Sequence, residues 1–167
     1  SEHSMIKEAL NNVVNGISLS EHEARGVMDE IMSGLATDAQ IAAFLVALSM
    51  KGETVEEIVG FAKVMREKVT QVKTSVKNLI DTCGTGGDRC GTFNISTATA
   101  LVVAGMGIPV AKHGNRAISG HCGSADVLEA LGVALVREPQ IMSLCIEEAG
   151  IGFLFAPLFH KSMRFAS

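Results

Sequence analysis

After residue 78, short apolar segments alternate with helical ones, and this alternation limits the possible folds more than any other feature. Four segments are predicted to be strands, the first of them buried: "NLID" (78–81), "PVAK" (109–112), "VALV" (133–136) and "GFLF" (152–155). Helices are expected between them, from about 96 to 105, up to 131, and through 147. Such an alternation predicts a parallel sheet with right-handed crossovers. Ligands of an α/β domain of this kind lie in the loops at the carboxyl ends of its strands.

Residues 5–70 have a different pattern, which is typical of a small helical bundle. Three capping boxes predict helix starts: Ser20 with Glu23, Thr37 with Gln40, and Thr54 with Glu57. Three glycines fall where the preceding helices should end: Gly16, Gly34 and Gly52. Apolar residues recur at helical spacing as two rows: Ile41, Phe44, Leu45 and Leu48, then Val55, Ile58, Val59, Ala62 and Met65. The segment 70–78 is the expected linker between a helical domain (5–70) and the α/β domain (78–167).

The composition narrows the classes of function. Apolar residues make up 47% of the 167 residues and charged residues 19%, so the chain can bury a core. The net charge of -4 and the scattered basic residues argue against a nucleic-acid partner. The sequence shows neither a secretory signal nor an apolar run long enough to span a membrane, which predicts a cytoplasmic protein. Its four cysteines lack metal-site spacing and are expected to be reduced thiols.

The segment "DTCGTGGDRCGTFNIST" (81–97) follows the first predicted strand and combines glycines with hydroxyl residues. Glycines at Gly84, Gly86 and Gly87 allow backbone N–H groups to approach a bulky ligand. Three polar residues fall at the start of the next helix, where free N–H groups favour an anion: Asn94, Ser96 and Thr97. This pattern predicts a phosphate site that is neither a Walker loop nor a dinucleotide fingerprint. The alternative is that Asn94 and Ser96 only cap the helix and the glycines only turn the chain.

Asp88 is unusual in a phosphate loop because a carboxylate repels a phosphate. It is therefore expected to face a hydroxyl or a metal ion that accompanies the phosphate, and a ribose diol meets that need. The alternative is an exposed loop charge without a ligand.

The segment "KHGNRAISGHCGSAD" (112–126) supplies the positive charge that the first loop lacks. Lys112 ends a predicted strand and can reach a diphosphate as a compact charge, while Arg116 adds a planar fork and Ser119 a hydroxyl. His113 and Asn115 could recognise an aromatic or carboxylate co-substrate. The alternative for His113 is a structural histidine, and the same two readings apply to His160 after "FLFAP" (153–157).

Several separate motifs together resemble one enzyme family, the anthranilate phosphoribosyltransferases of tryptophan biosynthesis. The motifs occur in order as "GTGGD", "NIST", "KHGNRAISG", "GSADVLEALG" and "FLFAPLFH", and the helical stretch "GLATDAQIAAFLVALSMKGETVEEI" resembles the family's N-terminal domain. The resemblance implies a nucleoside phosphorylase/phosphoribosyltransferase-like fold and a homodimer formed through the N-terminal helices. It also implies transfer of the 5-phosphoribosyl group from phosphoribosyl pyrophosphate (PRPP) to the amine of anthranilate, with Mg2+ and release of pyrophosphate.

The same resemblance implies the roles of particular residues. The residues expected to bind PRPP are Gly84, Thr85, Gly86, Gly87, Asp88, Thr92, Asn94, Ser96, Thr97, Lys112 and Ser119. Those expected to place anthranilate or lie along its approach are Gly84, His113, Asn115, Arg116 and His160. Ser96 is expected to contact the magnesium. No catalytic nucleophile is expected, because departure of pyrophosphate and attack by the amine require positioning and electrostatic stabilisation.

The sequence departs from the family pattern in its length. Members of the family continue for about as long again, with a further anthranilate-binding arginine and an Asp-Glu pair that binds magnesium. The resemblance therefore implies that this chain is an N-terminal half, with little or no activity alone and a tendency to associate through uncovered apolar faces. Two other functions stay open: a pyrimidine nucleoside phosphorylase, which shares the fold and a phosphate loop, and a non-catalytic dimerisation fragment.

Overall fold

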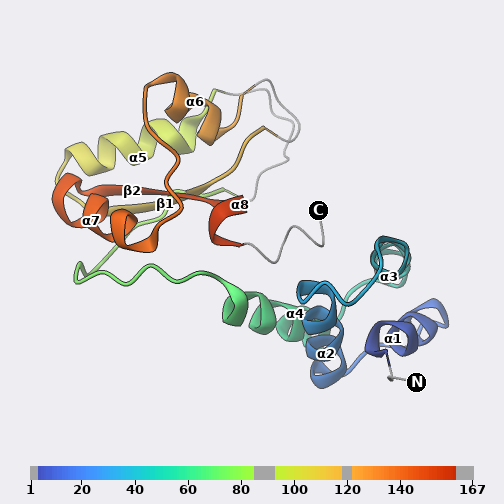
Figure 1. The fold of residues 1–167 in the computed structure, drawn as a ribbon. Helices are drawn as coiled ribbons and strands as arrows, with labels where there is room; N and C mark the ends of the chain where they lie inside the picture. Colours follow the sequence, from blue (N-terminus) through green and yellow to red (C-terminus); the bar gives the residue numbers. More distant parts are fainter. Residues whose placement is uncertain (1–3, 85–92, 118–121, 161–167) are drawn as a thin grey trace. The chain divides into compact units, whose positions relative to one another are not determined.

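The computed structural model describes residues 4–84, 93–117 and 122–160. The chain divides into two compact units, one reaching Val69 and also containing His160, the other covering Thr70–Phe159. The first unit contains the helices α1 (Met5–Val14), α2 (Glu21–Met32), α3 (Asp38–Lys51) and α4 (Val55–Lys68). The second contains α5 (Ile95–Gly105), β1 (Val110–Gly114), α6 (Ser124–Ala130), α7 (Pro139–Ala149), β2 (Ile151–Phe155) and α8 (Ala156–Phe159) (Figure 1). A helical unit followed by an α/β unit confirms the predicted fold class. Within the described residues, none of these helices is long and apolar enough to cross a membrane.

The starts of α2, α3 and α4 are set by local sequence. In each predicted capping box the first side chain accepts a hydrogen bond from the backbone of the fourth residue, whose own side chain accepts one in return. At α2 these bonds join Ser20 and Glu23, at 3.3 Å and 2.8 Å. Gly16, Gly34 and Gly52 have φ between +72° and +85°, as expected for glycines that end helices. These predictions are confirmed.

The second apolar row of the sequence lies on a helix, α4, as expected, but it is not the buried side of that helix. Val55 and Ile58 of α4 are 73% and 54% exposed, and the buried residues of that helix are Glu57, Gly60 and Val64. Gly60 explains the difference, because a Cβ there would lie 2.7 Å from the Cβ of Ala24. The missing side chain lets α2 pack closely on this stripe of α4, where it makes extensive contact. In α3, three residues of the first apolar row are buried, namely Ile41, Phe44 and Leu48, whereas Leu45 is exposed.

Glu57 is a fully buried carboxylate that the apolar pattern did not predict. Its oxygens accept hydrogen bonds from the backbone N–H groups of Leu19 at 2.8 Å and Thr54 at 2.7 Å, and from the Lys51 ammonium at 3.0 Å. Burial alone would raise the pKa of Glu57, but these hydrogen bonds outweigh it and hold the pKa below the ordinary value. The carboxylate thus joins the segment before α2 to the start of α4.

In the second unit, β1 and β2 form a parallel pair from Val110–Ile151 to Gly114–Phe155. Side chains alternate between the two faces of this pair. Phe153 and Phe155 pack against Ala125 and Leu128 of α6, whereas Leu154 packs against Met142 of α7. Figure 1 shows α5 and α7 on opposite sides of the strands. Because Lys112 pairs with Phe153 in the register, its side chain belongs to the face that α5 and α6 cover.

Two of the four predicted strands need correction. "NLID" forms only an isolated parallel bridge between Ile80 and Val110, and Leu79 and Ile80 are exposed rather than buried. "VALV" forms no strand in the described structure; Leu135 and Val136 instead pack against the two apolar clusters of the sheet. The composition of a short apolar run does not decide whether a neighbouring strand is present to pair with it.

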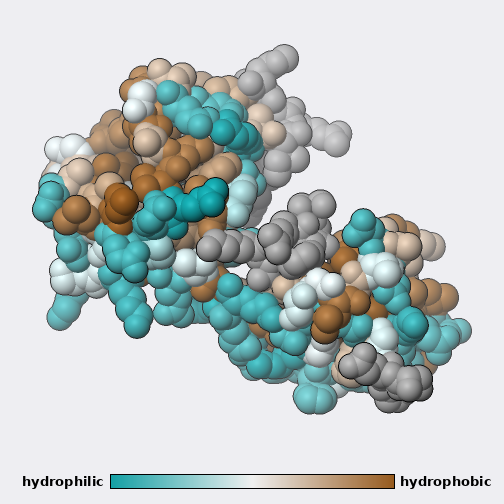
Figure 2. All heavy atoms as spheres, viewed as in Figure 1, coloured by the Kyte–Doolittle hydropathy of each residue, from teal (hydrophilic) through white to brown (hydrophobic). Residues whose placement is uncertain are grey.

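Large apolar side chains remain exposed on both units, as the brown surface in Figure 2 shows for one face. The helical unit exposes Val14, Ile17, Leu35, Leu45, Val46, Met50, Val55 and Ile58. The α/β unit exposes Phe93, Ile95, Leu101, Val102, Met106, Ile108, Leu131, Val133, Ile141 and Leu144.

Candidate functional site

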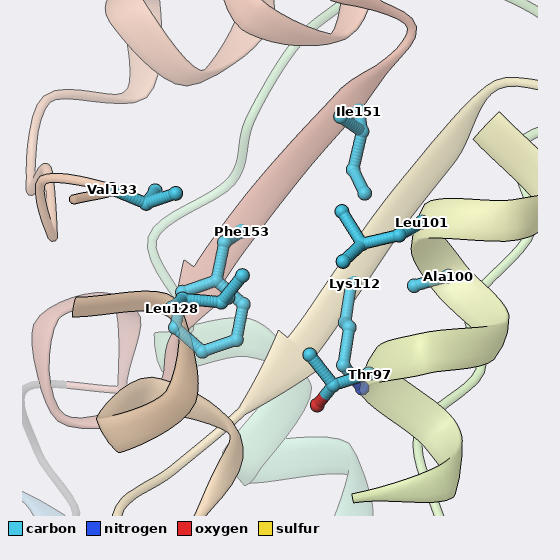
Figure 3. Close-up of a pocket in the computed structure, with 8 residues that line it drawn as sticks. All are labelled: Thr97, Ala100, Leu101, Lys112, Leu128, Val133, Ile151 and Phe153. Atoms are coloured by element: carbon cyan, nitrogen blue, oxygen red, sulfur yellow. The ribbon is translucent and has the colours of Figure 1, made fainter. Parts of the chain in front are cut away.

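A hollow of about 90 Å³ opens on the face of the strands that α5 and α6 cover (Figure 3). It is lined by Thr97, Ala100, Leu101, Lys112, Leu128, Val133, Ile151 and Phe153. Six of these residues are apolar, and Lys112 is the single charged residue among the eight. In Figure 3 the Lys112 amine and the Thr97 side chain reach the same end of the hollow.

Lys112 is a buried and loosely held cation. Its side chain leaves β1 and is only 3% exposed. The Nζ atom donates to Thr82 Oγ1 at 3.5 Å and to the His113 carbonyl at 3.4 Å, which are both long contacts. Burial lowers the pKa of Lys112, and the nearby Cys83 and Asp81 oppose that effect only in part. A buried amine with such weak partners favours an anionic ligand.

Thr97 lies in the first turn of α5 and is 2% exposed. Its hydroxyl Oγ1 has no hydrogen-bond partner in the part of the chain that the structure describes. A buried hydroxyl without a partner costs about 1–3 kcal/mol, so such groups are uncommon unless a ligand supplies the bond. The hydroxyl and the ammonium in one hollow therefore fit oxygen atoms of an anion.

The first loop meets the second at the start of α5. Asn94 occupies the position before the helix, yet its side chain makes no cap; its Nδ2 donates to the Cys122 carbonyl at 3.1 Å. The backbone carbonyl of Ser96 accepts from Thr82 Oγ1 at 2.8 Å, and the Ser96 hydroxyl faces Gly84, where a Cβ would be 3.9 Å away. The capping alternative thus fails for the Asn94 side chain, which instead joins the two polar segments.

His113 is held by Asp81, a residue that the sequence analysis did not single out. Asp81 Oδ2 lies 2.8 Å from the ring Nδ1 of His113, and Oδ1 accepts from the His113 backbone N–H at 3.2 Å. The same Oδ1 accepts from the Cys83 backbone N–H at 2.9 Å. Asp81 therefore fixes both the start of the first loop and the end of β1. The position of Asp81 at the end of a predicted strand is the sequence feature that points to a role in the site.

Arg116 is paired with two further carboxylates that sequence reasoning missed. Its Nη1 lies 2.9 Å from Asp126 Oδ1 and 2.6 Å from Glu129 Oε2. Hydrogen bonds to Glu129 and then Asp126 raise the pKa of Arg116 above the ordinary value. The preceding Asn115 uses its Oδ1 to accept from the Arg116 backbone N–H at 2.8 Å. In the sequence, only the spacing of Asp126 and Glu129 in "GSADVLEALG" (123–132) indicates that the two acids lie on one side of a helix and can share a partner.

The structure does not place the other expected site residues at the hollow. Thr85, Gly86, Gly87, Asp88, Thr92 and Ser119 lie outside the described residues. His160 directly follows α8 and is half-buried, but it is grouped with the first unit, so it is not placed relative to the hollow. Within 4–84, 93–117 and 122–160, no three His, Cys, Asp or Glu side chains gather as a metal site would require.

Both parts of the chain match known protein families. Residues 7–69 match the helical bundle domain of the glycosyl transferase family, and residues 76–167 match the a/b domain of that family. Among curated proteins, the chain is 60% identical over 163 residues to an anthranilate phosphoribosyltransferase of Desulforamulus reducens, covering 98% of this chain and 47% of that protein. It is 58% identical to the enzyme of that name from Pelotomaculum thermopropionicum, with the same coverage. The chain spans about half the length of the curated relatives it matches.

Solved structures of similar proteins carry the same enzyme name as these relatives. Anthranilate phosphoribosyltransferase from Thermus thermophilus superimposes with a TM-score of 0.86 at 46% identity, over 95% of this chain and 48% of that one. The enzyme of that name from Saccharomyces cerevisiae, solved in complex with PRPP and Mg, gives a TM-score of 0.85 at 26% identity, over 98% of this chain and 50% of that one. With both domains matched in order, this chain belongs to the glycosyl transferase family.

Proposed function

We propose that this chain forms the PRPP-binding part of an anthranilate phosphoribosyltransferase. That enzyme would transfer the 5-phosphoribosyl group from PRPP to the amine of anthranilate and release pyrophosphate. The observation that carries the proposal is the pairing in one hollow of a buried, weakly bonded Lys112 with the unpartnered hydroxyl of Thr97. The names of the most similar relatives support the choice of substrates over those of a pyrimidine nucleoside phosphorylase.

In this proposal the polar end of the hollow receives the pyrophosphate of PRPP. Lys112 and the first turn of α5 stabilise the negative charge that grows on pyrophosphate as it leaves, and Thr97 donates its hydroxyl. The other residues proposed to bind PRPP are Gly84, Thr85, Gly86, Gly87, Asp88, Thr92, Asn94, Ser96 and Ser119. The amine then attacks the ribose carbon, so correct placement supplies much of the rate.

Anthranilate is proposed to lie near Gly84, His113 and Asn115. The Asp81 carboxylate fixes the His113 ring, and the Arg116 backbone orients the Asn115 amide. Both side chains are therefore held in defined orientations before substrate binds, which reduces the entropy lost on binding. His160 remains a proposed residue of the anthranilate approach.

Mg2+ is proposed to arrive with PRPP, because a relative was solved with both. Ser96 is proposed to offer one hydroxyl for it; among the described residues, no three His, Cys, Asp or Glu side chains gather around a common point. Bound to the diphosphate, the ion would neutralise part of its charge. A homodimer formed through the helical unit and a cytoplasmic location are further proposals.

The proposal is tested by calorimetric titration of the 167-residue chain with PRPP in magnesium buffer. Lys112→Ala is expected to weaken PRPP binding by about 10- to 100-fold, the range for a charged hydrogen bond. Lys77→Ala removes the same charge from an exposed position of the linker and is expected to change nothing. A folded wild-type chain that binds no PRPP, or two lysine variants with equal effects, would overturn the proposal.

A second titration separates the competing functions. Thymidine or uridine with inorganic phosphate should produce no heat and no free base if the chain binds PRPP as proposed. Phosphorolysis of either nucleoside, with no response to PRPP, would favour the nucleoside phosphorylase instead.

A further inference from the structure

The two ends of the second polar loop, residues 115–117 and 122–126, lie back to back. A side chain at Gly123 would overlap the backbone of Arg116 and Ala117, so only glycine permits this approach. From the other side, the Asn115 carbonyl accepts hydrogen bonds from Ser124 Oγ and from the Ala125 backbone N–H, each at 3.2 Å. The loop is thus closed at its base, beside the start of α6.

A single carboxylate joins the two ends. Asp126 Oδ2 accepts from the Gly123 backbone N–H at 2.7 Å and from the Ala117 backbone N–H at 3.2 Å. Its other oxygen, Oδ1, accepts from Arg116 Nη1 at 2.9 Å. Hydrogen bonds from Gly123, Ala117 and Arg116 lower the pKa of Asp126, so the group stays ionised at neutral pH.

Arg116 is committed to the same assembly. Besides Asp126 it bonds Glu129, and its guanidinium carbon lies 5.6 Å from the centroid of the Phe155 ring. Two carboxylates around one guanidinium leave the group of three with a net charge of -1. Such a group cannot offer a phosphate or a carboxylate the excess positive charge that anion binding needs. The Arg116 guanidinium therefore makes its ion pairs within the protein.

We propose that Arg116 and Asp126 form a latch that joins residues 115–117 to residues 122–126 and positions Asn115 for substrate, and that neither is a substrate ligand. The inference rests on the proposed function for its substrate and replaces the role that the family resemblance implied for Arg116. Asn115 follows Lys112 by three residues on the same chain segment. Loss of the latch would therefore change the placement of Asn115 without removing its side chain.

Double-mutant cycles on PRPP affinity and on anthranilate affinity decide between a latch and a ligand. For a latch, Arg116→Ala and Asp126→Ala each weaken PRPP binding on the order of tenfold, and the double variant is no weaker than either single one. If Arg116 instead binds either substrate, Asp126→Ala frees a positive charge and leaves the affinity for that substrate unchanged or higher, while Arg116→Ala lowers it. That opposite pattern would overturn the proposal.

Amide hydrogen exchange provides a second readout that does not require substrate. The N–H groups of Ala117 and Gly123 are expected to exchange at least tenfold faster in Asp126→Ala than in the wild-type chain. Lys112→Ala serves as the matched control, since it should weaken PRPP binding and leave these two amides unchanged. Unaltered exchange in folded Asp126→Ala overturns the latch, whatever the PRPP result. If the wild-type chain binds no PRPP, the proposed function and the effect of the latch on substrate are both overturned. The exchange rates of the Ala117 and Gly123 amides still show whether Asp126 holds the two ends of the loop together.

Discussion

Asp81 binds His113 twice, through the ring Nδ1 at 2.8 Å and the backbone N–H at 3.2 Å. An ionised carboxylate can only accept hydrogen bonds, so in neutral His113 the ring proton is expected on Nδ1. In Asp81→Asn, the amide can rotate to donate to Nδ1, which moves the proton to Nε2. Long-range ¹H–¹⁵N spectra of the His113 ring distinguish these tautomers. An Nε2-protonated ring in the wild-type chain would contradict the assignment.

Thr97→Val is expected to separate stability from binding. Removal of an unpartnered buried hydroxyl should raise the free energy of unfolding by about 1 kcal/mol, because its desolvation cost disappears. The same change should weaken PRPP binding, since the ligand loses its donor. Thr99→Val, at an exposed position of the same helix, should alter neither quantity. Urea unfolding and calorimetry measure the two effects; a destabilised Thr97→Val with normal PRPP affinity would argue for a structural hydroxyl.

PRPP affinity is expected to fall as the pH rises through the lowered pKa of Lys112. Burial lowers the pKa of Lys112, so the free chain loses this proton below the ordinary value of 10.5. The bound anion favours the ammonium form of Lys112. Below the lowered pKa this form is already present, and PRPP binds with full affinity. Above that pKa, the chain must take up a proton when PRPP binds, and its affinity for PRPP falls. Titrations in buffers of different ionisation enthalpy measure this uptake. Lys112→Arg, which stays protonated, should remove it; an equal uptake in that variant would assign the proton elsewhere.

Glu57→Gln is expected to destabilise the helical unit by about 3 kcal/mol, since it leaves Lys51 buried beside an uncharged partner. The pKa of Glu57 is lowered in the folded state, so its contribution is complete above the ordinary value of 4.5 and is lost as the pH falls through the lowered pKa. The wild-type and variant chains should therefore converge in stability in acid. Glu23→Gln, in an exposed capping box, should cost much less. Equal losses in both variants at pH 7 would exclude a special role for Glu57.

The isolated chain is expected to associate through the helical unit. Val46 and Met50 are exposed on one face of α3, four residues apart, and burial of such a face is favourable. Val46→Glu should lower the mass found by light scattering toward that of a monomer. Val102→Glu places the same charge on exposed α5 of the other unit and serves as the control. A wild-type chain that is monomeric at all concentrations would contradict this prediction.

Much of the architecture could be predicted because it depends on neighbouring residues. A capping box joins residues three apart, as at Ser20 and Glu23, and a glycine ends a helix through its own backbone. The parallel pair of β1 and β2 follows from strands separated by helices. The candidate site was predicted in part for the same reason, since Thr97 and Lys112 fall directly at a helix start and on a strand.

Other features depend on partners that are distant in the sequence, and local patterns do not reveal them. The Val55 row of α4 was as apolar as any buried row, but Gly60 let α2 pack against a different stripe. "VALV" has the composition of a strand, but within the described residues it pairs with no other strand. The pattern around Arg116 did not reveal that its guanidinium pairs with Asp126 and Glu129. Local propensity and spacing determine which elements form, whereas packing determines which face is buried and which charge remains available to a ligand.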